Sequence, residues 1–161
     1  MSIQTSYDAG LAAAREGMIA DSGRTDVTSK VAHESITAGR FTTRQANGRI
    51  KLPALATDIT GGVGEGFAAL DTAREGAIGT GGSAPWVAGD VVPVLRKGRI
   101  YVVPETAFNE GEQVHVRYGG VGEKGAVRNA AVASETAILP GAVFRNSGSA
   151  SGLAIVEINL P

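Results

Sequence analysis

The 161-residue sequence contains no cysteine, and only 5% of its residues are aromatic. Without cysteine, disulfide bonds and thiolate metal sites are excluded. With a single tryptophan, the core is expected to consist mainly of Val, Ile, Leu and Ala, which bury less area than aromatic side chains. No run approaches the roughly 20 apolar residues of a membrane helix, and the first residues lack the pattern of a secretory signal. We therefore expect a soluble protein with no membrane partner.

Net charge is also nearly absent, because the formal charge is −1 and the isoelectric point is near 6.1. A charge this small gives no overall field that would attract nucleic acid or anionic lipid. Hydrophobic residues make up 43% of the chain, which is not the composition of a disordered protein. The length suits one domain with its own core.

Glycine, in contrast, is abundant at 23 residues, and it separates short runs of β-branched residues. The most informative runs are Val91–Arg96 and Arg99–Val103, on either side of Lys97-Gly98. Because glycine adopts the positive φ of a tight turn, this pattern predicts a hairpin. A second hairpin is predicted at Asn47-Gly48, and further strands at 113–118, 142–145 and 153–158. Short strands at this spacing are typical of a sandwich or barrel.

Two segments leave alternatives open. The first, residues 1–30, is either a short helix or an extended arm that becomes ordered against a neighbour. Its helical spacing rests on Leu11, Arg15, Met18 and Ile19, but two glycines in the same stretch each cost about 1 kcal/mol in a helix. The second, residues 66–71, fits a helix by propensity and a strand equally well. We divide the chain into an N-terminal arm, 1–30, and a β-domain, 31–161.

Motifs for catalysis and cofactor binding are not found in the sequence. Gly62–Gly66 differs from a dinucleotide-binding loop because its third glycine comes one residue early. His33 and His115 are far apart, and neither belongs to a cluster with metal-ligand spacing. No serine lies in a G-x-S-x-G motif. We expect no enzyme activity, no cofactor and no metal site.

Basic residues form two groups along the chain. Arg40 and Arg44 belong to a stretch with no acidic residue between positions 38 and 57, and Arg96, Lys97 and Arg99 surround the predicted turn. A surface that binds nucleic acid would combine such charge with exposed aromatic residues for stacking, which are scarce here. We therefore expect both groups to be solvated faces or to contact an acidic protein neighbour, and we expect no nucleic-acid partner.

Several segments, in order along most of the chain, resemble one family. They are residues 17–22 (GMIADS), 27–36 (VTSKVAHESI), 88–102 (AGDVVPVLRKGRIYV), 110–117 (EGEQVHVR), 139–144 (LPGAVF) and 152–158 (GLAIVEI). Together they resemble the capsid cement, or decoration, proteins of tailed bacteriophages. The best marker is the A-G-D-V-V-x-V-L-R-x-G-R segment followed by a G-(D/E)-x-V-x-V-R strand.

The resemblance implies a compact β-sandwich or jelly-roll-like barrel with an N-terminal arm, and a strand at 66–71. It also implies a virion protein on the outer surface of an icosahedral capsid, which binds the major capsid protein and stabilises contacts between its subunits. Self-association is expected, with a homodimer favoured over a trimer. The residues expected to contact the capsid are Leu11, Arg15, Met18, Ile19, Arg40, Arg44, Arg96, Lys97 and Arg99.

Two other functions stay open from the sequence. One is a β-barrel module that binds nucleic acid or carbohydrate, and the other is a structural protein of the phage tail or baseplate.

Overall fold

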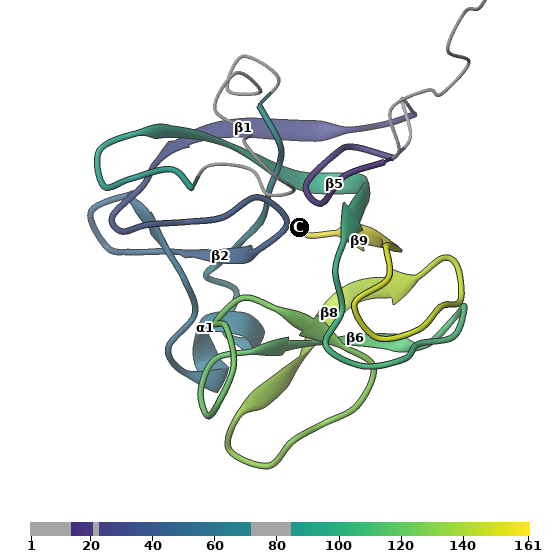
Figure 1. Ribbon diagram of the computed structural model, residues 1–161. Helices are drawn as coiled ribbons and strands as arrows, with labels where there is room; N and C mark the ends of the chain where they lie inside the picture. Colours follow the sequence, from purple (N-terminus) through teal and green to yellow (C-terminus); the bar gives the residue numbers. More distant parts are fainter. Residues whose placement is uncertain (1–13, 21–22, 72–84) are drawn as a thin grey trace, which may run out of the picture.

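The computed structural model describes residues 14–20, 23–71 and 85–161, and these fold as an all-β protein (Figure 1). Its strands are β1 (Asp26–Val31), β2 (Phe41–Arg44), β3 (Ile50–Lys51), β4 (Gly64–Ala68), β5 (Val91–Val102), β6 (Gln113–Arg117), β7 (Val127–Arg128), β8 (Thr136–Phe144) and β9 (Ala154–Asn159). One short helix, α1 (Ala56–Thr60), lies between β3 and β4. The all-β prediction is confirmed, and the jelly-roll arrangement stays a prediction.

These strands join into one antiparallel sheet that curls into a half-barrel. Hydrogen-bonded neighbours follow the order β3-β2-β4-β5-β9-β8-β6-β7, and β1 pairs with β5 beside this path. β5 joins the two halves of the sheet, because its first part pairs with β1 and β4 and its second part pairs with β9. A strand with partners along both edges is held in place along its whole length.

The hairpin predicted at Lys97-Gly98 is wrong. Residues Val91–Val102 form one continuous strand. Lys97 pairs with Asp26 of β1 on one side and with Asn159 of β9 on the other. Gly98 does have a positive φ of 127°, but it lies inside the strand and pairs with Ile158. Partners from distant parts of the chain therefore keep β5 extended through a glycine that locally favours a turn.

The other predicted strands are largely present. The hairpin at Asn47-Gly48 is confirmed, because Thr43 pairs with Lys51 and Gly48 has a φ of 80°. The strand chosen over a helix at 66–71 is present as β4, which begins and ends slightly earlier. The strands predicted at 113–118 and 153–158 are β6 and β9, and the run at 142–145 is the end of a longer strand, β8.

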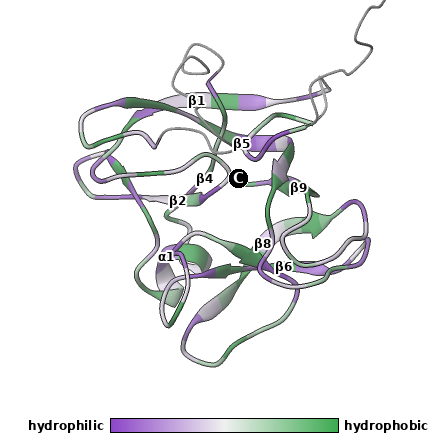
Figure 2. Ribbon diagram, in the orientation of Figure 1, coloured by the Kyte–Doolittle hydropathy of each residue, from purple (hydrophilic) through white to green (hydrophobic). Residues whose placement is uncertain are grey.

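The buried hydrophobic residues form two clusters, and many of their members are apolar strand positions, which Figure 2 colours green. Aliphatic residues make up most of both clusters, as expected, yet the few aromatic residues occupy central positions. In the larger cluster, Phe108 and Phe144 stack with ring centroids 5.0 Å apart, and Phe41 meets Phe67 edge to face at 5.5 Å. Trp86 is buried in the smaller cluster. Each aromatic ring therefore buries more surface area than an aliphatic side chain would at the same position.

The described part of the predicted N-terminal arm lies along β5. The Gly17 amide donates to the Tyr101 carbonyl at 2.7 Å, and the Tyr101 amide donates to the Met18 carbonyl at 2.8 Å. Further along, β1 continues the pairing at the same edge of β5. Residues 14–20 contain a turn at 16–17 and a bridge at Ile19, and no helix. The division of the chain at residue 30 stays a prediction, and β1 crosses that position. In the part of the chain that the structure describes, no helix is long and apolar enough to span a membrane.

Candidate protein-binding groove

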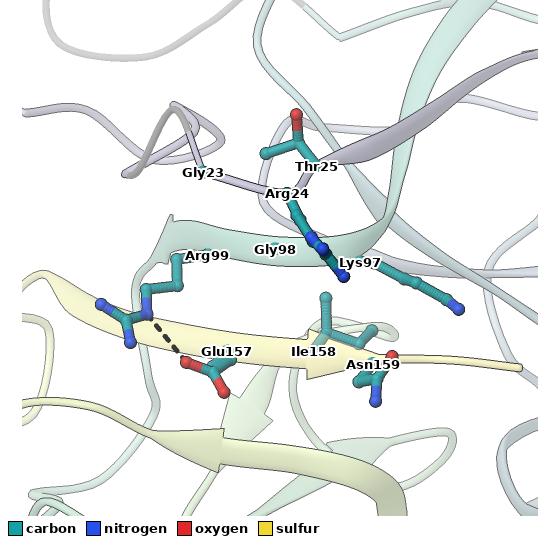
Figure 3. A pocket seen from close by; sticks show the side chains of 9 residues that line it. All are labelled: Gly23, Arg24, Thr25, Lys97, Gly98, Arg99, Glu157, Ile158 and Asn159. Carbon is teal, nitrogen blue, oxygen red and sulfur yellow. Dashed lines mark hydrogen bonds and ion pairs between the residues drawn. The ribbon is translucent and has the colours of Figure 1, made fainter.

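A surface groove of about 400 Å³ lies where the loop before β1 approaches β5 and β9 (Figure 3). The loop contributes Gly23, Arg24 and Thr25, β5 contributes residues 97–99, and β9 contributes residues 157–159. In Figure 3 the Arg24 side chain extends from the loop across Gly98 towards Ile158. Three segments that are distant in sequence thus form one concave surface.

Gly98 is the residue that lets the loop lie this close to β5. A Cβ atom at this position would lie 3.0 Å from the Thr25 Cγ2 atom. Its φ of 127° is also one that residues with a side chain rarely adopt. The glycine that suggested a turn in the sequence therefore forms part of the groove floor.

One carboxylate in the groove is shared by two arginines. The Arg99 Nε atom donates to Glu157 Oε2 at 2.8 Å, and the Arg145 Nη2 atom donates to Glu157 Oε1 at 2.7 Å. Hydrogen bonds from Arg145 and Arg99 lower the pKa of Glu157 from the usual 4.5 to about 2. Glu157 therefore stays ionised near neutral pH and is shared between two guanidinium groups.

Two further cations add positive charge to the described lining of the groove. Arg24 and Lys97 are exposed, and neither forms an ion pair with another of the described residues. Asp26 stands opposite Lys97 in the pairing of β1 with β5, without an ion pair between the two side chains. The groove can therefore attract a carboxylate-bearing partner by charge.

Comparisons with known proteins place this chain in a family. Residues 3–159 match the family described as "Structural cement protein (E217 gp24/Pam3 gp6)". The chain belongs to the phage structural cement proteins. A similar solved structure is a chain of "The capsid of Myoviridae Phage XM1", with a TM-score of 0.73, 22% identity, and coverage of 99% of this chain and 98% of that one. No curated protein matches the sequence.

Family membership confirms the recognition made from the sequence and identifies the chain as a structural component of the phage capsid. At 22% identity, the likeness to the phage XM1 chain shows a shared fold. The partner surface, the symmetry of assembly and the residues that contact the capsid stay predictions.

Two of the predicted contact residues of the cement protein, Lys97 and Arg99, lie together in the groove. Arg96 does not join them, because it lines a separate pocket beside α1 and the C-terminal residues. Its Nη2 atom donates to the Pro161 carbonyl at 2.5 Å. Alternation along an extended strand separates Arg96 from its two neighbours, whereas a hairpin turn would have gathered all three.

Two other basic residues predicted as contacts, Arg40 and Arg44, form internal ion pairs in the cement protein. Arg40 is largely covered and pairs with Glu16, 3.0 Å away, and with Glu123. Burial raises the pKa of Glu16 despite the nearby Arg40 charge. Arg44 is half exposed and lies 3.8 Å from the buried Glu65. Arg40 thus connects the N-terminal segment to a loop before β7.

The predicted contacts of the N-terminal segment lie along the C-terminal end of β5, beside Ile100 and Tyr101. Ile19 is 39% exposed and bridges to Ile100. Met18 is half-buried and Arg15 is exposed, whereas Leu11 falls outside the described residues. These residues are not part of the groove.

Sequence analysis missed Arg24 and Glu157 as groove residues. Arg24 stands alone in a loop, and Glu157 lies in a strand about 60 positions from Arg99, so no local spacing signals their contact. The pairing of β1 with β5 places Arg24 beside the groove, and the pairing of Lys97–Val102 with Ala154–Asn159 brings Glu157 to Arg99. Sequence analysis also missed Arg117, which lies on β6 and binds two glutamates inside the protein.

The two histidines lie apart in the cement protein. His33 is exposed after β1, and His115 is half-buried on β6, where burial and the Arg128 charge lower its pKa. Among the described residues, no group of three or more His, Asp or Glu side chains is arranged to hold a metal ion.

Proposed function

We propose that this cement protein binds the outer surface of an icosahedral phage capsid and stabilises contacts between major capsid protein subunits without catalysis. The observation that carries the proposal is the family match over residues 3–159. The fold supports it, because a rigid curled sheet presents a fixed shape to a repeating surface. The cationic groove supports it further as a surface complementary to acidic protein.

The proposed stabilisation is a linkage effect. A protein that binds two neighbouring subunits in the assembled shell, and not the separated subunits, favours the assembled state by mass action. Stable protein interfaces bury on the order of 1,600 Å². Because the shell repeats the same site many times, a modest affinity per copy is sufficient to resist disruption of the whole particle.

Shell binding is the direct test. Full-length protein is added to purified capsids that lack it, and bound protein is measured by sedimentation. We expect binding that saturates at a fixed number of copies per major capsid subunit, together with a higher temperature of shell disruption. No binding to shells would overturn the proposal, and binding confined to purified tails would favour the tail or baseplate function instead.

We also propose that the protein associates with itself on the capsid as a homodimer, with a trimer as the alternative. Particle reconstruction with the protein bound would place the copies relative to the symmetry axes. Isolated copies without mutual contact would contradict self-association.

A further inference from the structure

We propose that the groove between the 23–25 loop and β9 binds an extended segment of the capsid protein that carries carboxylates at alternate positions. This inference rests on the proposed function and deepens it by naming a binding surface and the chemistry of its partner. The groove is open to solvent, and its lining combines both exposed cations with the Arg99–Glu157 pair (Figure 3).

Charge is the first argument for this partner. Within the described residues, Arg24, Lys97 and Arg99 line the groove with Glu157 as the acidic side chain among them. Arg145, in the loop that follows β8, binds the same glutamate and adds another cation. An acidic segment would bring carboxylates to Arg24 and Lys97, and a carboxylate beside Arg99 would add to the Glu157 contact rather than replace it. Such complementarity mainly raises the association rate and the specificity.

Spacing is the second argument. Lys97 and Arg99 are two residues apart on an extended strand, so their side chains leave the same face about 7 Å apart. An extended partner repeats its own side chains at the same interval. Carboxylates at positions i and i+2 of that partner therefore match Lys97 and Arg99, while Arg24 covers the segment from the loop side (Figure 3).

Nucleic acid fits the groove less well than an acidic peptide. Sequence-independent binding of single strands uses aromatic side chains as stacking platforms, and the residues that line the groove include no aromatic ring. The formal charge of −1 over the whole chain also gives no wider basic surface to follow a phosphate backbone.

A second copy of this chain also fits the groove less well. Most acidic side chains in the described part already accept hydrogen bonds or ion pairs within their own chain, namely Glu16, Glu34, Asp58, Glu65, Asp90, Glu105, Glu112, Glu123, Glu135 and Glu157. A partner copy could therefore supply few carboxylates without breaking internal contacts. A different protein with an acidic segment carries no such cost.

Charge reversal tests the groove directly on capsids. Full-length protein with both Arg24→Glu and Lys97→Glu is compared with wild type for binding to shells in low salt. We expect at least a tenfold weaker affinity, because two attractive contacts become repulsive. The matched control compares the single Lys97→Glu and Lys124→Glu proteins, because Lys124 is an exposed cation outside the groove; Lys124→Glu is expected to stay within about twofold of wild type. Equal loss in the two single variants, or no loss in the groove variant, would overturn the inference.

A peptide probe separates this inference from the proposed function. Fluorescence anisotropy with isolated full-length protein compares a peptide with glutamate at alternate positions and the same peptide with glutamine. Preference for the glutamate peptide, lost in the groove variant, supports the site even where shell binding fails. Binding of a single-stranded oligonucleotide in preference to this peptide would overturn the choice of partner. Shell binding that ignores the groove would leave the cement function standing without this site.

Discussion

Arg117 and Arg99 bind glutamate in opposite surroundings. The Arg117 side chain is only 6% exposed and donates to Glu105 at 2.7 and 2.8 Å and to Glu135 at 2.5 Å. Arg99 is 44% exposed and shares Glu157 with a second arginine. Arg117 therefore contacts two carboxylates, one of which also lies 3.7 Å from Arg128, whereas Arg99 and Arg145 share one.

The difference separates a contact that holds the fold from a surface that is available to a partner. A buried arginine must be fully paired, because an unpaired charge away from water is costly. An exposed arginine is solvated, so its ion pair adds little to stability and its charge remains effective at the surface. The same residue type thus fixes the loop after β6 in one place and gives the groove its positive charge in another.

Replacement of Arg117 is expected to have the largest effect on stability. Arg117→Met leaves Glu105 and Glu135 without their main partner, and we expect the free energy of unfolding to fall by about 3 kcal/mol. Arg99→Met is expected to lower it by less than about 1 kcal/mol. Chemical denaturation of both variants measures the difference. Equal losses at the two positions would break the comparison.

The charged sites show what the sequence makes predictable. Lys97 and Arg99 were predicted as contacts because they surround the predicted turn at Lys97-Gly98. The turn is absent, but the extended strand keeps the two residues together. Arg24 and Glu157 were missed because their proximity depends on pairing across the sheet. Arg40 was predicted as a surface contact, but its partners Glu16 and Glu123 lie 24 and 83 positions away. Local charge runs therefore indicate cations without indicating which of them are already paired.

Two glycines sharpen the same comparison. A Cβ at Gly122 would lie 2.7 Å from Arg117 Nε and 2.9 Å from Glu105 Oε1, whereas a Cβ at Gly98 would lie 3.0 Å from an exposed loop residue, Thr25. Both glycines have positive φ, of 136° and 127°. We expect Gly122→Ala to cost about 2 kcal/mol and Gly98→Ala about 1 kcal/mol, because the loop beside Gly98 can move away more easily. Thermal denaturation measures both, and a larger loss at Gly98 would contradict this account.

The fold was predictable to the extent that local pattern determines it. Alternating apolar residues indicated β6 and β9, and Asn47-Gly48 fixed the β2–β3 hairpin. Gly98 misled because a glycine between two β-rich runs has the same local pattern in a hairpin and in a long strand. The decision depends on β1 and β9, which supply partners along both edges of β5. No short segment of sequence contains that information.

Acid titration gives the smallest expected effect and distinguishes the two kinds of carboxylate. The pKa of Glu157 is lowered to about 2, so its ion pairs contribute stability above pH 4.5, and this contribution is lost as the pH falls towards 2. Glu157→Gln should therefore be less stable than wild type by up to about 1 kcal/mol at pH 7, and the two proteins should converge on acidification. Denaturation at a series of pH values measures this convergence.

Glu16 provides the control of opposite sign. Because burial raises its pKa above 4.5, the protonated form is favoured in the folded state, and the associated stability is lost as the pH rises through the folded pKa. Relative to Glu16→Gln, wild type should then lose stability as the pH rises above 4.5, whereas relative to Glu157→Gln it should gain stability over the range from 2 to 4.5. Parallel pH dependence for the two variants would show that exposure and pairing do not separate these carboxylates in the way the structure indicates. Opposite slopes of stability against pH would extend the contrast between Arg117 and Arg99 to the acidic residues. Burial raises the pKa of a carboxylate, as at Glu16, whereas neighbouring arginines lower it, as at Glu157.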